Sequence, residues 1–190
     1  MPLLVIEPKG LLFRKTDLRD DNLENTAAEN CLVFKDHRLL FREGTRDFLD
    51  FIYNRYTIGF YSSLPKKLLK QILNLLLTPE QKSKTLFVWG EDRLRLDTNT
   101  YNFRTYKSIK DVLQNPEINC RRVWNYSNVV FLESNCKKVQ KIPMLNLCLV
   151  KKFSGSPTDL ILYDLMGTLP KHYFHGSLSV LDGMFGDESD

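Results

Sequence analysis

Residues 56–77 read YTIGFYSSLPKKLLKQILNLLL, and this stretch decides the fold class. Its first part, Thr57–Tyr61, is short, apolar and rich in β-forming residues. Its second part repeats leucine and isoleucine at helical spacing from Leu68 to Leu76, with Pro65 in the expected first turn. A strand followed by an amphipathic helix is half of a βαβ unit. The apolar stripe could instead form a partner groove or a membrane face, but packing against a sheet is the favoured interpretation.

Other short apolar runs alternate with helical patterns along the chain. Most are apolar at nearly every position, which is typical of parallel strands covered on both faces. Helical patterns lie at Thr45–Tyr53 and near residues 158–166. We therefore predict an α/β fold with three α/β/α layers, Rossmann-like, around a central and mainly parallel sheet. The predicted strands are Leu3–Ile6, Thr57–Tyr61, Thr85–Trp89, residues 129–132 and residues 145–150.

The length of 190 residues suits one domain with a sizeable core. We expect this domain over residues 1–170, followed by a tail over residues 171–190 that is either disordered or binds a partner. Residues 16–30 are rich in Asp, Asn and Glu, so we expect a surface excursion there.

Composition limits the function classes. The net charge of +4 is mild and spread along the chain, which allows an acidic or phosphorylated protein partner and makes nucleic acid an unlikely one. The four cysteines form no CxxC pair and the three histidines complete no zinc spacing, so we expect free thiols and no metal. No apolar run is long enough to span a membrane or to act as a signal peptide. We expect an intracellular protein of the cytoplasm, nucleus or an organelle matrix, not a secreted one, and its oligomeric state stays open.

Polar side chains stand where the predicted strands end, and ligands of open parallel sheets bind at that edge. They are Glu7 and Lys9 after the first strand, Ser62 and Ser63 after the second, Lys107 before a helix, and Glu133 and Ser134 after the fourth. Ser62 or Ser63 could equally serve only as the N-cap of the following helix.

Several ordered segments carry a family resemblance. Residues 41–49, FREGTRDFL, followed by residues 56–63, YTIGFYSS, resemble the RPG-x-x-x-FL segment and the following strand of the FCP/small-CTD-phosphatase group. Residues 86–89 and the stretch from residue 106 to residue 132 have a similar look. This group includes the NLI-interacting-factor domain and belongs to the haloacid-dehalogenase (HAD) superfamily. The resemblance covers roughly residues 3–153 and implies the HAD fold.

The same resemblance implies a degenerate catalytic site. Enzymes of the group carry D-x-D-x-[TV] after the first strand, where the first aspartate accepts the phosphoryl group and the second acts as general acid and base. Here the two positions hold Glu7 and Lys9. Displacing a reacting group by about 1 Å can cost about a hundredfold in rate, and lysine cannot repeat the acid–base cycle of an aspartate in the same geometry. We therefore expect no catalytic residue.

The metal-binding pair of the group is incomplete as well. Its D-[DN] pair, which helps to hold Mg²⁺, corresponds to Glu133 and Ser134, so one carboxylate remains. We expect no cofactor and no tight magnesium site, and we hypothesise that Lys9 fills the space of the metal between Glu7 and Glu133. The same three residues could instead form only a structural salt bridge.

The phosphate-binding positions match the motifs of the group better than the catalytic and metal positions do. Ser62 matches the hydroxyl of the second motif and Lys107 the lysine of the third. With Ser63 and Lys9 they are the predicted phosphate- or ligand-binding residues, because a hydroxyl, a helix N-terminus and ammonium groups bind an oxyanion. Less favoured substitutes for Lys107 are Lys110, Arg121 and Arg122.

These observations favour a catalytically inactive HAD-type pseudophosphatase that acts as a protein-interaction module for an extended peptide, phosphorylated or acidic. One alternative is an active magnesium-dependent Ser/Thr protein phosphatase whose carboxylates come from Asp17, Asp20 or Asp21 in the polar excursion. The other alternative is a structural subunit of a larger complex.

Overall fold

The computed structural model describes residues 1–17, 31–34, 36–98 and 104–175. A five-stranded sheet in the order β10-β9-β1-β5-β6 forms its centre, and every pairing in this sheet is parallel. Its strands are β1 Leu3–Ile6, β5 Thr57–Tyr61, β6 Thr85–Trp89, β9 Val129–Glu133 and β10 Leu147–Leu149. The predicted α/β class and parallel sheet are confirmed, and the fifth strand is shorter than the predicted 145–150.

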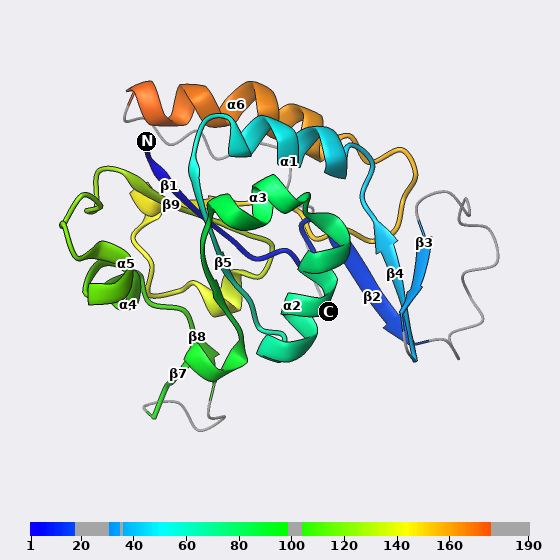
Figure 1. Ribbon diagram of the computed structural model, residues 1–190, viewed down its shortest axis with the longest axis horizontal. Coiled ribbons are helices and arrows are strands. Elements are labelled where there is room, and N and C mark those ends of the chain that lie inside the picture. The colour runs from blue at the N-terminus through cyan, green and yellow to red at the C-terminus, as the bar shows by residue number, and fades with distance from the viewer. Residues whose placement is uncertain (18–30, 35, 99–103, 176–190) are drawn as a thin grey trace, which may run out of the picture.

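Helices cover both faces of this sheet (Figure 1). Side chains of β1 alternate between two cores, with Leu4 and Ile6 in one and Leu3 and Val5 in the other. Helices α1, α2 and α6 pack on the first core and α4 and α5 on the second, which gives the predicted three layers. The α-helices are α1 Thr45–Tyr53, α2 Lys66–Leu76, α3 Pro79–Lys84, α4 Ile109–Leu113, α5 Pro116–Asn119 and α6 Ile161–His175. The 3₁₀ helices in the described part of the chain are η3 Glu91–Arg93, η4 Cys136–Lys138 and η5 Met144–Asn146.

Helix α2 is the predicted crossover helix between β5 and β6. Its stripe of Leu69, Ile72 and Leu73 is buried in the core, so it is neither a partner groove nor a membrane face. The expected serine N-cap is wrong, because the residue before the helix is Pro65 and no side chain caps it. The hydroxyl of Ser62 instead donates to Glu7, as described below.

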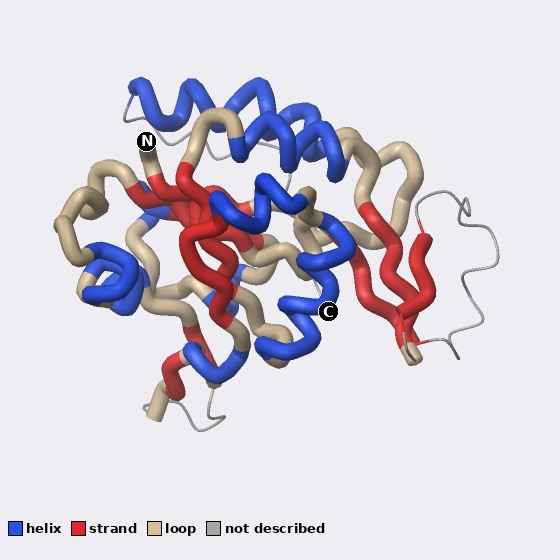
Figure 2. The backbone as a smooth tube through the Cα atoms, viewed as in Figure 1, coloured by secondary structure: helices blue, strands red, loops and turns tan. Residues whose placement is uncertain are grey.

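A second sheet, not predicted from the sequence, lies beside the main one (Figure 2). Its antiparallel strands lie in the order β2-β4-β3. The expected excursion over residues 16–30 begins inside β2, and its residues 18–30 lie outside the described part of the chain. The strands are β2 Phe13–Asp17, β3 Cys31–Phe34 and β4 His37–Phe41, and a further short pair consists of β7 Arg95–Leu96 and β8 Thr105–Tyr106.

The last helix is longer than predicted. It begins at Ile161 and ends at His175, because Leu162, Leu165 and Leu169 continue one buried stripe past the expected end at residue 166. It therefore crosses residue 170, where we placed the end of the domain, and residues 176–190 of the expected tail lie outside the described part. Within the described ranges, no helix has the length and apolar character needed to cross a membrane.

Candidate functional site

The parallel arrangement brings the predicted site residues to one edge of the sheet. Strand β1 lies between β5 and β9, with Ile6 level with Phe60 and Leu132. Glu7 directly follows β1, and its backbone N–H donates to the carbonyl of Leu132 at 3.0 Å. The carboxyl ends of three neighbouring strands therefore meet, and residues from all three can reach one point.

Lys107 occupies that point. Its backbone N–H donates to the carbonyl of Lys138 at 2.7 Å, which fixes the segment that leads into α4. Its Nζ lies 3.0 Å from Oε2 of Glu7 and 2.5 Å from Oε2 of Glu133. The three side chains are at most 4% exposed. The ammonium also lies 5.6 Å from the ring centroid of Tyr61.

The cation between the carboxylates is thus Lys107, and the hypothesis that Lys9 lies there is wrong. Lys9 lies in the turn after β1, and its hydrogen bonds to Glu7 and Ser134 come from its main chain. Its N–H donates to Oε1 of Glu7 at 3.2 Å, and its carbonyl accepts from Ser134 Oγ at 3.4 Å. Among the described residues, the Lys9 side chain forms no ion pair.

The carboxylate of Glu7 accepts from four donors. Oε1 accepts from the hydroxyl of Ser62 at 2.5 Å and from the N–H of Lys9. Oε2 accepts from the N–H of Ser63 at 2.8 Å and from Lys107. The Ser62 oxygen itself accepts from the N–H of Leu64 at 3.1 Å, which leaves its proton directed to Glu7. The residues predicted to hold phosphate are therefore together, and their donors point at Glu7.

Glu133 is held in a similar way. Its Oε1 accepts from the N–H groups of Ser134 at 2.9 Å and Asn135 at 3.0 Å, while Oε2 accepts from Lys107. All four oxygens of the two carboxylates are thus hydrogen-bonded. Glu133 and Ser134 were predicted at this edge from the sequence, but the main-chain role of Ser134 and Asn135 was not, because every residue type except proline offers that donor.

Burial and charge act in opposite directions in this cluster. Burial alone would lower the pKa of Lys107, but the attraction of Glu7 and Glu133 and their hydrogen bonds outweigh it and raise the pKa. Burial raises the pKa of Glu133, and the negative charge of Glu7 raises it further, against the opposing effect of Lys107. The cluster holds two carboxylates and one ammonium, and among the described residues Lys107 is the only cation that forms an ion pair with either carboxylate.

This donor set does not fit the Mg²⁺ that the phosphatase resemblance implies. Magnesium needs octahedral oxygen ligands with free lone pairs directed to one point. Here the point between the two carboxylates holds Lys107 Nζ, a cation that would repel the metal. Within the described ranges, no group of three His, Cys, Asp or Glu side chains could hold a metal ion.

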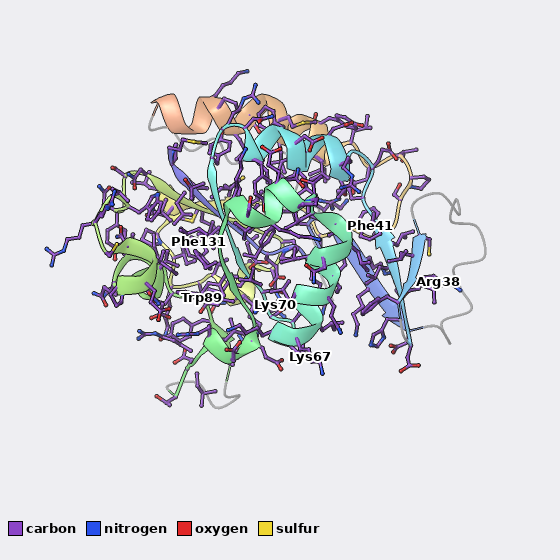
Figure 3. The ribbon with its side chains drawn as sticks, viewed as in Figure 1. Arg38, Phe41, Lys67, Lys70, Trp89 and Phe131 are labelled. Carbon is purple, nitrogen blue, oxygen red and sulfur yellow. The ribbon has the colours of Figure 1, made fainter. Side chains whose placement is uncertain are left out.

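Other residues singled out in the sequence lie away from this cluster. Arg121 and Arg122 are exposed, and Lys110 lines a separate cavity of about 410 Å³ with Trp89 and Asp111. Trp89, labelled in Figure 3, is 6% exposed. Its ring packs edge-on against that of Tyr61, with ring centroids 5.3 Å apart.

The carboxylates proposed for a rearranged site are not brought to the cluster in the described part of the chain. Asp17 ends β2, where its carboxylate pairs with His37 at 3.0 Å. This strand leads away from the main sheet (Figure 1). Asp20 and Asp21 lie outside the described residues.

Comparison with known proteins extends over most of the chain. The family model described as NLI interacting factor-like phosphatase matches residues 3–177. No curated protein matches the sequence.

Two solved structures of Fcp1 share the fold. One is a variant of the fission yeast RNA polymerase II CTD phosphatase Fcp1 bound to beryllium fluoride, with a TM-score of 0.51 and 17% identity over 80% of this chain. The other, an Fcp1 described as an essential RNA polymerase II CTD phosphatase, has a TM-score of 0.50 and 15% identity over 90% of this chain. The matches span 42% and 48% of those chains, so this chain covers less than half the length of either.

Proposed function

The chain belongs to the NLI interacting factor-like phosphatase family, and from this premise we propose that it is a catalytically inactive pseudophosphatase that acts as a protein-interaction module. One observation carries the proposal: the carboxylate of Glu7, which stands at the position of the nucleophile, accepts four hydrogen bonds, two at each oxygen. A carboxylate nucleophile needs an oxygen free to attack phosphorus. Both oxygens of Glu7 are tied to two donors each.

The acid–base step lacks a group as well. In the enzymes that this chain resembles, the residue two positions after the nucleophile acts as the general acid and base. The corresponding residue here is Lys9. An ammonium cannot act first as acid and then as base in the place of a carboxyl group at neutral pH without a large fall in its pKa. This supports an inactive domain.

We further propose that the domain works without Mg²⁺ or another cofactor. The metal would have to displace Lys107 from a buried position in which two hydrogen-bonded ion pairs hold it. That displacement would bury an unpaired ammonium elsewhere or expose it at the cost of both pairs.

The interaction role is supported by the charges around this edge. The loops that follow the strands there carry more basic than acidic side chains in the described residues. Lys152 lies against the turn after β1, since its Cγ is 3.2 Å from where a side chain on Gly10 would begin. Lys67 and Lys70, labelled in Figure 3, are exposed on α2. Within four residues of the strand ends and in the first turn of α2, the exposed or half-buried cations are Lys9, Lys66, Lys67, Arg93, Lys137, Lys151 and Lys152, whereas the exposed acidic residues are Glu91 and Asp92 and the third acidic residue, Glu7, is buried.

A basic edge of this kind attracts an acidic or phosphorylated segment and speeds its association at low salt. The proposed ligand is therefore an extended peptide of that character, lying across the carboxyl ends of the strands.

A phosphatase assay tests directly whether the domain is catalytically inactive. The wild-type chain and Glu7→Ala are incubated with an aryl phosphate and magnesium, and we expect equal, background rates from both. Turnover by the wild type that Glu7→Ala abolishes would support the alternative of an active phosphatase. A purified phosphatase added to the same preparation serves as the control that the assay detects activity.

Charge reversal tests the interaction role. Lys67→Glu combined with Lys152→Glu is expected to weaken capture of protein partners when the tagged chain is purified from its native source. Lys82→Glu is the matched control, because this exposed lysine lies on α3, next to the amino-terminal end of β6. Equal capture by all variants would contradict a basic docking edge. Recovery of one partner in fixed proportion, unaffected by charge reversal, would instead favour the structural-subunit alternative.

A further inference from the structure

Glu7 fills the place that an anion would otherwise take. The side chain is one methylene longer than aspartate, and its carboxylate extends from the end of β1 to the end of the neighbouring strand β5. There it meets the hydroxyl of Ser62, the N–H of Ser63 and the ammonium of Lys107 at 2.5, 2.8 and 3.0 Å. Three donors from two separate segments that converge on one pair of oxygens form an oxyanion site.

We infer that Glu7 is a permanent internal ligand of this oxyanion site, so that a phosphoryl group of a partner cannot occupy it in the native chain. The inference rests on the proposed function and narrows it. The peptide partner would be recognised through acidic side chains at the basic edge rather than through a phosphate seated on Ser62, Ser63 and Lys107.

The hydrogen-bond donors of this site are already used by Glu7. The hydroxyl of Ser62 and the N–H of Ser63 have one proton each, and both are given to Glu7. Lys107 gives protons to Glu7 and to Glu133. A phosphate at this point would find its two neutral donors already used, and a buried oxyanion without donors is strongly disfavoured.

A bound phosphate would also disturb the charge balance of the cluster. The cluster already holds two carboxylates and one ammonium with no side chain more than 4% exposed. A phosphate dianion would bring further negative charge next to Glu7 and Glu133 in a region that screens charge poorly. A monoanion that replaces the Glu7 carboxylate, by contrast, would leave the balance of charge unchanged.

Glu7→Ala with acetate is the test. The substitution removes the last methylene and the carboxylate of Glu7, and acetate has the same two carbons and the same charge. We expect acetate to raise the melting temperature of Glu7→Ala and to bind to it in a calorimetric titration. The wild type should show neither response. Glu7→Gln is the matched control, because its amide keeps the volume of the native side chain and should leave no room for acetate.

A second substitution locates the bound acetate. Ser62→Ala added to Glu7→Ala removes one donor to a charged acceptor and is expected to weaken acetate binding by about tenfold or more. Acetate binding by Glu7→Ala that Ser62→Ala leaves unchanged would overturn the inference. So would the same response in the wild type, or no response in a folded Glu7→Ala protein.

Inorganic phosphate gives a measurement that needs no variant. The amide resonance of Ser63 in the wild type is expected to stay in place as phosphate is added, because Glu7 keeps its donor. A saturable shift of that resonance would overturn the inference even if Glu7→Ala failed to fold. The outcome is separable from that of the phosphatase assay: turnover by the wild type rejects the proposed function, whereas an inactive chain whose Ser63 amide responds to phosphate rejects only this inference.

Discussion

Lys107 and Glu133 form a buried ion pair in which Nζ lies 2.5 Å from Oε2 and each side chain is 1% exposed. The same ammonium lies 3.0 Å from Glu7, so one cation serves two carboxylates. Removing both members of a buried ion pair can be tolerated, but removing one leaves an uncompensated charge in the interior. Each member of this cluster is therefore needed while the others are present.

Lys107→Met should destabilise the domain strongly. The change leaves Glu7 and Glu133 without their shared countercharge, and the expected loss is about 3–5 kcal/mol in the free energy of unfolding at pH 7. Urea denaturation measures it. Lys110→Met is the matched control, because this exposed lysine lies three residues away and should change stability by no more than about 0.5 kcal/mol. A loss below about 1 kcal/mol for Lys107→Met would mean that the ion pairs are not formed in solution.

Glu133 should make stability fall as pH rises from the acid side. Burial raises its pKa above the ordinary 4.5, so above that pH the folded chain keeps a proton that the unfolded chain releases. The contribution is present below pH 4.5 and is lost as pH rises through the raised pKa. Unfolding free energies from pH 4 to 8 should therefore fall more steeply for the wild type than for Glu133→Gln.

Glu80 provides a control of opposite sign for the same series. Its hydrogen bond and attraction to Lys84 lower its pKa, so its contribution is present above pH 4.5 and is lost as pH falls through the lowered pKa. In the wild type, ionisation of Glu80 should slightly increase the free energy of unfolding as pH rises towards 4.5. Glu80→Gln should lack this increase. Identical pH profiles for the wild type and Glu133→Gln would contradict the raised pKa of Glu133.

Tyr53 should contribute to unfolding in alkali. Burial raises its pKa to about 12, against a smaller lowering by the hydrogen bond to Thr85. Between pH 10 and 12 the unfolded chain loses this proton and the folded chain keeps it, so stability falls by up to about 1.4 kcal/mol per pH unit. Tyr53→Phe should have a shallower profile in that range by urea denaturation. Parallel profiles would show that the ring is not buried as described.

Two glycines should respond to alanine in opposite directions. At Gly59 on β5, a side chain would begin 2.3 Å from the ring of Phe87 on the neighbouring strand, so Gly59→Ala should cost about 1–3 kcal/mol through overpacking. Gly167 in α6 has no atom within 4 Å of that position, and Gly167→Ala should stabilise by about 0.5–1 kcal/mol. Thermal unfolding compares the two, and a second change, Phe87→Leu, should reduce the cost at Gly59 if the ring causes it.

Much of the main sheet could be predicted from local patterns. Buried parallel strands such as Leu3–Ile6 are apolar on both faces, and α2 repeats its apolar residues at the helical period. The second sheet escaped prediction because its strands are only partly covered. In Cys31–Phe34 no side chain is fully buried, so neither a continuous apolar run nor a strict alternation marks it.

The candidate site was predictable in its members but not in its contacts. Glu7, Ser62 and Glu133 follow strands, and a parallel sheet must place those positions at one edge. Helix α2 begins after Pro65, not after a serine, because of where the chain turns after β5. The hydroxyl of Ser62 therefore donates to Glu7 instead of capping the helix.

The sequence by itself determined that this chain forms an α/β domain and that glutamate and lysine stand at positions 7 and 9, because both are local properties of the chain. Only the tertiary structure decided which lysine lies between the carboxylates. Lys9 is two residues from Glu7 and Lys107 is one hundred, yet Lys107 makes the contact. The turn after β1 and the hydrogen bond from Lys107 to Lys138 set the positions of these side chains, and both depend on the assembled sheet.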